Sequence, residues 1–420
     1  MVAWSRHMLG DLLEIKHGFA FKGEFFSDSG DHVLLTPGNF RETGGLKPKG
    51  EKEKFYRGEF PEDYLLRRGD MVVAMTDLVQ DAPILGSPAF VPDDNRFLHN
   101  QRLGKIINLK TNKIVPEFLF YLLNTASVRA QIKGSASGAT VRHTSPSRIY
   151  QVAVRLPSLP TQRRIAGILL AYDELIENSQ RRIQILETMA RALYREWFVH
   201  FRFPGHENVP RVDSPIGDLP EGWEVRSLSY LCSRMESGGT PRRNRPEYWT
   251  GGEISWFKTG ELWDGFVFDS EEKITEQARR ESTARVFESG TILMAIYGSP
   301  TVGRLGILTK PSSCNQAALG LVADSSRVSQ TFLYFVLFFL RDEFNGMAQG
   351  AAQQNISKEK VAGTMATVPP RVLVERFDSI AQPIMEQIQG LQHQVSTLRR
   401  TRDLLLPRLL SGQVDLLASA

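Results

Sequence analysis

The chain has 420 residues, more than one ordinary hydrophobic core holds, so two or three domains are expected. An apolar fraction of 41% with 23% charged residues is typical of a folded globular chain and excludes a disordered one. The net charge of +4 permits a nucleic-acid partner without requiring one, and the two cysteines, Cys232 and Cys314, exclude a disulfide scaffold and a cysteine-rich zinc site.

The sequence pattern predicts neither a secretion signal nor a membrane span. The first residues lack the basic and apolar regions of a signal peptide. The most apolar run, Phe332–Leu340, has nine residues, whereas a membrane-spanning helix needs about 20. With so few cysteines, a reducing compartment fits best, and we expect a cytoplasmic protein with no membrane partner.

The first half of the sequence recurs in the second half. Six short matches keep their order, with shifts between 212 and 221 residues. They join Trp4 to Trp223, Arg68–Met75 to Ser289–Ile296, Asn100–Gln101 to Asn315–Gln316, Phe118–Tyr121 to Phe332–Phe335, Gly134 to Gly350, and Pro157 to Pro369. A period this long is not that of a solenoid. It predicts an internal repeat with pseudo-twofold symmetry, in which a whole domain and its trailing segment occur twice.

Each copy begins with a stretch of mixed secondary structure. Short strand-like runs such as Met71–Met75 and Thr291–Ile296 alternate with glycine, proline and short apolar helices such as Phe118–Leu123. The pattern predicts two similar α+β domains. The expected order is a first domain over 1–155, a first long helix over 156–200, a linker over 201–222, a second domain over 223–367, a second long helix over 368–411 and a tail over 412–420.

The trailing segments have the pattern of long amphipathic helices. Apolar residues recur at three- and four-residue spacings, and charged residues occupy the other face. The first stripe is Ile165, Ile168, Leu169, Tyr172, Leu175, Ile176, Ile183, Leu186, Met189, Leu193 and Trp197, and the second is Phe377, Ile380, Ile384, Ile388, Leu391, Val395, Leu398 and Leu405. Each helix is the natural partner of the other, so an antiparallel coiled coil is expected. The alternative is that each helix packs on its own domain.

Two prolines bear on the second helix. Pro383 removes a backbone donor and is expected to kink the helix near its start, and Pro407 is expected to end it.

Catalytic patterns are missing from the sequence. Gly298–Leu305 resembles a phosphate-binding loop but lacks the lysine and hydroxyl residue that follow the second glycine. No G-x-G-x-x-G and no Asn-Pro-Pro-Tyr occurs, and Glu271-Glu272-Lys273 is interpreted as a solvated charge run. The histidines show no metal-ligand spacing. We therefore expect no catalytic site and no metal site in this chain.

Basic and amide side chains instead gather in glycine-rich loops of both domains, interleaved with aromatic residues. Lys and Arg contact phosphates, and Arg, Asn and Gln read base edges in the major groove. The candidates in the first domain are Lys22, Asn39, Arg41, Lys47, Lys49, Lys52, Arg142 and His143. Those in the second domain are Arg242, Arg243, Asn244, Arg245, Lys258, Thr259, Arg304, Gln353, Gln354 and Asn355. Two such clusters in equivalent places of the duplicated domains favour a functional role over ordinary exposed charge.

Four motifs together resemble the specificity (S) subunit of a Type I restriction-modification enzyme. Leu219–Val225 with Leu228 resembles the opening of a target recognition domain, and Leu156–Pro157 with Pro160–Ala166 resembles the start of the spacer helix. The end of that helix and the C-terminal close are matched by Leu193–Val199 with Phe203–His206, and by Leu405–Gly412. In the second copy, Val368–Pro370 is present, but Glu375-Arg376 stands where the family has Glu-Gln.

The resemblance implies a subunit that binds double-stranded DNA and has no catalytic site. Each recognition domain would read one half of a bipartite, asymmetric DNA site, and the helices would set the spacer between the halves. The implied partners are methyltransferase (M) subunits, two of them, and restriction (R) subunits held through the complex. This chain would carry no cofactor, because S-adenosylmethionine would bind the M subunits and ATP the R subunits. The alternatives are the specificity subunit of a related Type II system, or an enzyme with an unrecognised site in the duplicated loops.

Overall fold

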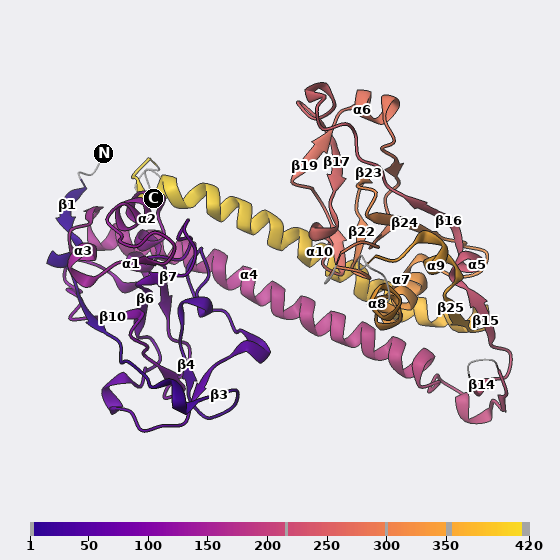
Figure 1. The fold of residues 1–420 in the computed structure, drawn as a ribbon, viewed down its shortest axis with the longest axis horizontal. Helices are drawn as coiled ribbons and strands as arrows, with labels where there is room; N and C mark the ends of the chain where they lie inside the picture. The colour runs from indigo at the N-terminus through magenta and orange to yellow at the C-terminus, as the bar shows by residue number, and fades with distance from the viewer. Residues whose placement is uncertain (1–3, 215–216, 299–300, 350–354, 414–420) are drawn as a thin grey trace. The chain divides into compact units, whose positions relative to one another are not determined.

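The computed structural model describes residues 4–214, 217–298, 301–349 and 355–413, and it divides into two units (Figure 1). Unit 1 comprises residues 1–175 and 398–420, and unit 2 comprises residues 176–397. Each unit contains one α+β domain together with adjoining stretches of two long helices. The predicted α+β class is confirmed in both.

The domain of unit 1 is built on a four-stranded antiparallel sheet. Its strand order is β2-β10-β6-β8, formed by β2 (Glu14–His17), β10 (Leu103–Ile107), β6 (Met71–Ala74) and β8 (Pro88–Phe90). Two helices pack on it, α1 (Pro116–Leu123) and α2 (Ala126–Gly134). A smaller sheet, β3-β5-β4-β9, contains the parallel pair β4 (Val33–Leu34) and β9 (Phe97–Leu98) and the strands β3 (Phe26–Ser27) and β5 (Phe55–Tyr56).

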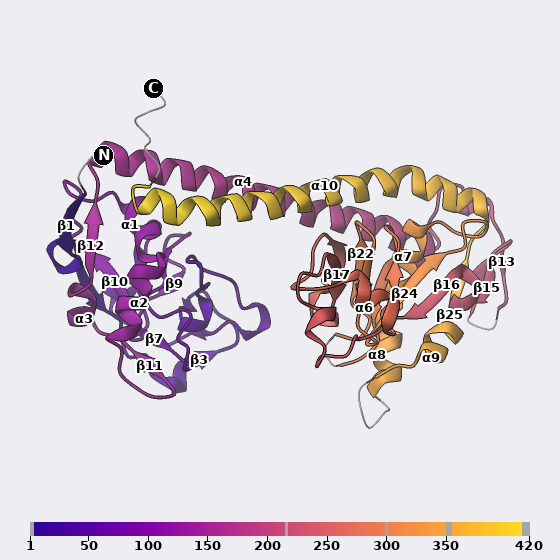
Figure 2. The same ribbon diagram turned by 90° about the horizontal axis from the view of Figure 1, so that it is seen from above.

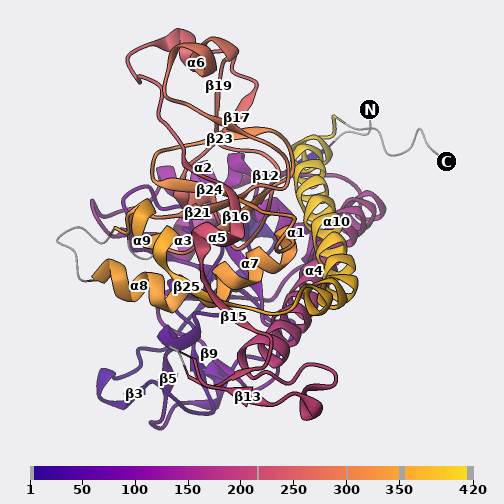
Figure 3. The ribbon, with the colours of Figure 1, turned by 90° about the vertical axis from the view of Figure 1, so that its right-hand side faces the viewer.

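The domain of unit 2 repeats this plan. Its main sheet has the order β16-β24-β21-β22-β18, formed by β16 (Cys232–Ser237), β24 (Ala318–Ala323), β21 (Ile292–Ala295), β22 (Leu305–Leu308) and β18 (Gly265–Val267). Helices α7 (Gln330–Phe339) and α8 (Arg341–Gln349) pack on it. The smaller sheet, β19-β17-β23-β20, consists of β19 (Glu272–Ile274), β17 (Ile254–Phe257), β23 (Ser312–Cys314) and β20 (Val286–Phe287). It projects with α6 (Glu276–Glu281) away from α7 and α8 (Figure 3).

Matching hydrogen bonds establish the repeat residue by residue. In each copy a short antiparallel pair closes the domain: β1 (Ser5–Met8) with β12 (Ala153–Leu156), and β15 (Glu224–Ser227) with β25 (Met365–Val368). The amide of Leu9 donates to Val152 O at 3.0 Å, and that of Leu228 donates to Thr364 O at 2.9 Å. The sequence repeat therefore reflects a duplicated fold, as predicted.

Both predicted long helices are present. Helix α4 spans Leu159–Tyr194 and continues into a π-helical turn at Arg195–Val199, and α10 spans Arg371–Leu410. In each unit, one stretch of α4 lies beside one stretch of α10 and runs in the opposite direction (Figure 2). The same stretches also pack on the domain of their unit, so the two packing modes weighed from the sequence coexist.

The helix pairing differs in character between the units. In unit 1, Asp173 Oδ1 and Arg402 Nη1 lie 2.6 Å apart, and Tyr121 of α1 donates to the same carboxylate at 2.6 Å. In unit 2 the pairing is aromatic, because Tyr194 and Phe198 of the α4 end pack around the buried Phe377 of α10.

Proline does not end the second helix. Helix α10 runs unbroken through Pro383 and Pro407 to Leu410, contrary to the expected end at Pro407. Leu409 and Leu410 are buried in the core of unit 1, which compensates for the lost donor. Gly412 ends the helix instead: at φ +75° it donates to Leu409 O while Gln413 donates to Arg408 O, the pattern of a Schellman motif.

The expected apolar stripe of α4 is narrower in the structure. Ile165, Leu169 and Ile176 are buried, but Leu175 and Met189 are half exposed, because consecutive stripe positions drift around the helix. No helix in the described ranges is both long enough and apolar enough to cross a bilayer.

One contact joins α10 to the edge of the main sheet in unit 2. Strand β18 is the outermost strand, and the amide of Phe266 donates to Gln392 Oε1 at 3.0 Å. A Cβ at Gly265 would lie 2.6 Å from the Gln392 amide nitrogen, so the missing side chain permits this close approach.

Candidate nucleic-acid interface

In unit 1, most of the predicted cations lie on loops around the small sheet. Lys22, Arg41, Lys47 and Lys52 are exposed, and Lys49 is half buried. Within the described ranges none of these five residues forms an ion pair with a carboxylate, so their charge is available to a ligand. Lys49 Nζ lies 3.4 Å from Thr36 Oγ1.

The other predicted residues of unit 1 hold loops in place. Asn39 is buried; its Oδ1 accepts from the Thr36 amide and its Nδ2 donates to Glu53. The Arg142 guanidinium donates to backbone carbonyls at 3.0 Å (Lys133) and 3.3 Å (Gly138). These contacts leave little of either side chain for DNA. His143 is exposed, and its Nδ1 is hydrogen-bonded to Thr76 Oγ1 at 3.0 Å.

A cavity of about 460 Å³ opens beside these loops. Its lining contains the predicted Lys49, together with Lys54, Arg102, Phe21 and Phe26. Sequence reasoning did not select Arg102 or Phe26, because their approach depends on how β3 and the loop after β9 fold back. No periodicity carries that information.

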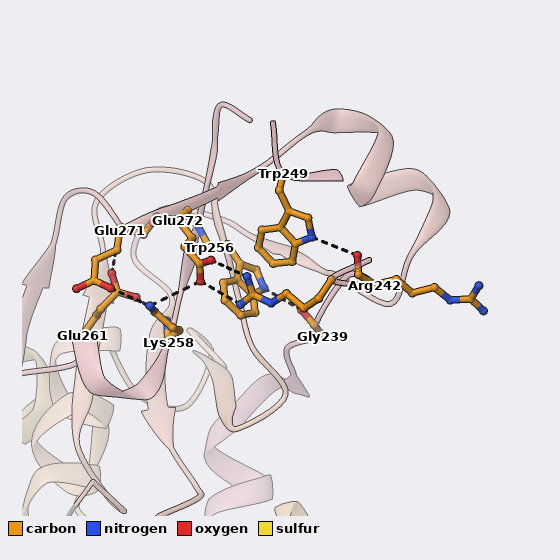
Figure 4. A network of polar contacts seen from close by, with 10 residues as sticks. Gly239, Arg242, Trp249, Trp256, Lys258, Glu261, Glu271 and Glu272 are labelled. Carbon is orange, nitrogen blue, oxygen red and sulfur yellow. Dashed lines mark hydrogen bonds and ion pairs between the residues drawn. The ribbon is translucent and has the colours of Figure 1, made fainter. Parts of the chain in front are cut away.

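In unit 2, three of the corresponding cations, Arg243, Arg245 and Lys258, are paired with carboxylates. Arg243 donates to both oxygens of Glu272, at 2.6 and 3.0 Å, and its guanidinium carbon lies 3.9 Å from the Trp249 ring centroid and 4.8 Å from that of Trp256. Lys258 Nζ lies 2.8 Å from Glu271 and 3.6 Å from Glu272 (Figure 4). The Glu271-Glu272 run, expected from the sequence as a solvated charge run, is open to solvent, with the Glu271 side chain 73% exposed, and it also takes part in this network of ion pairs.

The electrostatics of this network follow from its pairing. Hydrogen bonds from Arg243 lower the pKa of Glu272, and the hydrogen bond to Glu271 raises the pKa of Lys258. Both shifts favour the charged forms of the partners. The Arg243 guanidinium packs against both indole rings, which also contact each other edge to face with centroids 5.1 Å apart. These contacts fix the loop over 240–249, and the Trp249 indole adds a hydrogen bond by donating to Arg242 O at 3.2 Å.

The loop over 240–249 carries two further candidates whose side chains are open to solvent. Arg242 and Asn244 are exposed, and the Arg242 side chain points away from the network (Figure 4). Arg245, in contrast, donates to Tyr248 Oη at 2.8 Å and lies 3.6 Å from Glu281. The cluster predicted from sequence thus separates into exposed and structurally engaged side chains.

The last described candidates of unit 2 lie near the ends of β21 and β17. The Arg304 guanidinium lies 4.6 Å from the exposed Trp263 ring, and Thr259 begins a short 3-10 turn at the end of β17. Asn355 Oδ1 accepts from the Gly298 amide at 3.2 Å. Asn355 is equivalent to His143 of unit 1. The amide after His143 donates to Met75 O, the amide after Asn355 donates to Ile296 O, and these two acceptors correspond in the repeat. Gln353 and Gln354 lie outside the described residues.

The fold and these loops define a duplicated nucleic-acid-binding protein. Among the described residues, no three His, Cys, Asp or Glu side chains gather where they could hold a metal ion. Comparison with known proteins gives the class more closely. Residues 1–188 and 220–371 match the family described as Type I restriction modification DNA specificity domain, and the chain belongs to that family.

Individual relatives agree with this assignment. The chain is 28% identical to the Type I restriction enzyme MjaIX specificity subunit of Methanocaldococcus jannaschii, over 76% of this chain and 73% of that protein. It is 24% identical to the HindI specificity subunit of Haemophilus influenzae, over 99% of this chain and all of that protein. The crystal structure of the S subunit from M. genitalium shares the fold, with a TM-score of 0.65 at 16% identity, covering 97% of this chain and 96% of that one.

The family fixes the general role of the chain. It is the non-catalytic, DNA-specificity component of a Type I restriction-modification complex, and it acts with DNA and with other subunits. The alternative of an enzyme with an unrecognised site in the duplicated loops is thereby rejected.

Proposed function

We propose that each domain reads one half of a bipartite, asymmetric DNA site and that α4 and α10 set the spacer between the halves. The observation that carries the proposal is the duplication: two equivalent domains, with matched strand pairing and matched loops, are each followed by a long helix. Because the loop residues differ between the copies, the two half-sites differ in sequence, and the complete site is asymmetric.

The two domains contact DNA with different chemistry. In the first, Lys22, Arg41, Lys47, Lys49 and Lys52 supply unpaired charge for phosphates. In the second, carboxylates pair with Arg243, Arg245 and Lys258, so among the described basic candidates Arg242 and Arg304 keep unpaired charge for the ligand, with the exposed Asn244 beside Arg242. The first domain therefore contributes more of the electrostatic affinity.

We further propose the partners and their cofactors. Two M subunits bind the chain and carry S-adenosylmethionine, and R subunits join through them and carry ATP. The assembly works in the cytoplasm, where the host DNA lies. The half-exposed Leu175 and Met189 on α4 support a protein partner on the helices, because apolar side chains of this size gain free energy when covered.

Methylome sequencing of a host carrying the complete system tests this function. One bipartite motif with two unlike halves and a fixed gap is expected. Replacing residues 1–155 by the first domain of another family member should change one half-site only. A change in both half-sites would contradict independent recognition by the two domains. With its methyltransferase partner, the chain should bind that motif with an affinity that falls steeply as salt rises. Salt-insensitive binding would contradict the proposal.

A further inference from the structure

Two adjacent apolar side chains stand exposed on the loop after β7 (Thr76–Asp77) in unit 1. Leu78 is 54% exposed and Val79 is 51% exposed. Leu78 also lines the 460 Å³ cavity that contains Lys49, Lys54 and Arg102. About half of each side chain of this apolar tip is therefore open to solvent at the rim of a cationic cavity, and packing within this domain does not account for that half.

The loop that carries the tip is held in one conformation. Asp77 is buried, and its carboxylate accepts hydrogen bonds from the amides of Val79 at 3.2 Å and Ile84 at 2.7 Å. Strand β7 is paired with β11 (Arg142–His143), which fixes the other side of the loop. The apolar tip is therefore presented without an ordering cost at the moment of binding.

The cavity beside the tip has the chemistry of a nucleotide site. Phe21 and the partly exposed Phe26 give it aromatic walls, and both rings belong to a cluster around Tyr56. Three cations line the cavity, and none of the described lining residues is a carboxylate. Aromatic faces stack on bases and cations bind phosphates, so an anionic aromatic ligand fits better than an apolar or a cationic one.

We propose that this cavity receives a nucleotide unstacked from the DNA duplex, while Leu78 and Val79 insert into the base stack that it leaves. Apolar side chains that wedge between base steps partly unstack them and kink the duplex. The inference rests on the proposed DNA reading by the first domain and adds a deformation of the DNA to it. Specificity then includes the cost of opening one base step, which depends on the sequence opened.

The test uses the full chain bound to its methyltransferase partner. DNA duplexes carrying the motif found by methylome sequencing are labelled with 2-aminopurine at successive positions of the first half-site. Fluorescence should rise several-fold at the unstacked position. Because the partner can also unstack a base, the decisive comparison is with the double variant Leu78→Ser, Val79→Ser, in which the rise at one position should disappear. Val212→Ser, an exposed valine in the segment between the domains, is the matched control and should keep the rise.

A second variant tests the cavity independently of the tip. Gly23 lines the cavity, and a Cβ built there meets no atom within 4 Å, so the backbone accepts a side chain at this position and Gly23→Leu adds bulk to the cavity lining. It should weaken specific binding roughly five- to a hundredfold, the contribution of one stacked base. Circular dichroism checks that each variant is folded.

The outcomes separate the inference from the function on which it rests. Failure of the unmodified complex to bind the motif would refute DNA reading by this chain. Normal binding by the unmodified complex, together with a fluorescence rise that survives in the double variant, would refute the wedge. Full specific affinity in Gly23→Leu would refute occupation of the cavity and leave it as a contact for backbone phosphates.

Discussion

Acidification should destabilise the first domain through one histidine. His99 is fully buried; its Nε2 is hydrogen-bonded to Leu103 O at 3.0 Å, and its Nδ1 has no partner among the described residues. Burial lowers its pKa from 6.5 to about 4. Between these values the unfolded chain binds a proton that the folded chain does not, so stability is lost as pH falls below 6.5. The loss is about 2 kcal/mol at pH 5 and approaches about 3 kcal/mol at lower pH.

The second domain supplies the matched substitution. Cys314 occupies the equivalent position, and its Sγ lies 3.9 Å from Ala318 O, the counterpart of Leu103 O. Burial raises the pKa of this thiol to about 12, so a cysteine there does not titrate in acid. His99→Cys should therefore remove about 2 kcal/mol of the difference in stability between pH 7 and pH 5. Pulse proteolysis in urea, with fragments of residues 1–155 quantified by mass spectrometry, measures it. An equal loss in wild type and variant would refute the reasoning.

Three further perturbations test the interface and the helix pairing. Glu272→Gln should release Arg243 toward phosphates and steepen the salt dependence of log affinity by about 0.9, as measured by DNA binding across a potassium chloride series; an unchanged or shallower slope would contradict the neutralised network. Asp173→Ala should cost about 2 kcal/mol in urea unfolding, because the Tyr121 hydroxyl loses its acceptor and Arg402 keeps only Asp403 as a carboxylate partner, and a cost near zero would mean that the pair is solvated. Phe377→Ala should cost about 3–5 kcal/mol in the same assay, since its ring is fully buried, whereas a cost below about 1 kcal/mol would show a loosely packed aromatic core.

The fold could be predicted from sequence because its signals repeat. Helical spacing over residues 161–198 and the order of the six matches both survive local substitutions, and each domain supplies a check on the other. The end of α10 could not be predicted in the same way. Pro407 is a strong local signal, but burial of Leu409 and Leu410 outweighs the loss of one backbone hydrogen bond, and only the tertiary structure shows that burial.

The candidate site was less predictable than the fold. Composition finds the loops that hold Lys49 or Arg243, but the role of each cation depends on whether a carboxylate far along the chain reaches it. Glu272 lies 29 residues from Arg243, and no sequence pattern between them predicts that the two side chains form an ion pair. The exposed Leu78 could not be predicted either, because an apolar residue is assigned to the hydrophobic core unless the structure shows that it is exposed.

The contact made by the Gln392 side chain also affects the risk of aggregation during translation. Gln392 covers the outer edge of β18, yet it lies 126 residues after Phe266, to which it bonds. A sheet edge with an open donor can pair with another chain, which is a common start of aggregation. During translation this edge stays open until α10 leaves the ribosome. The nascent chain is therefore most prone to aggregation in that interval, and least prone once α10 has docked.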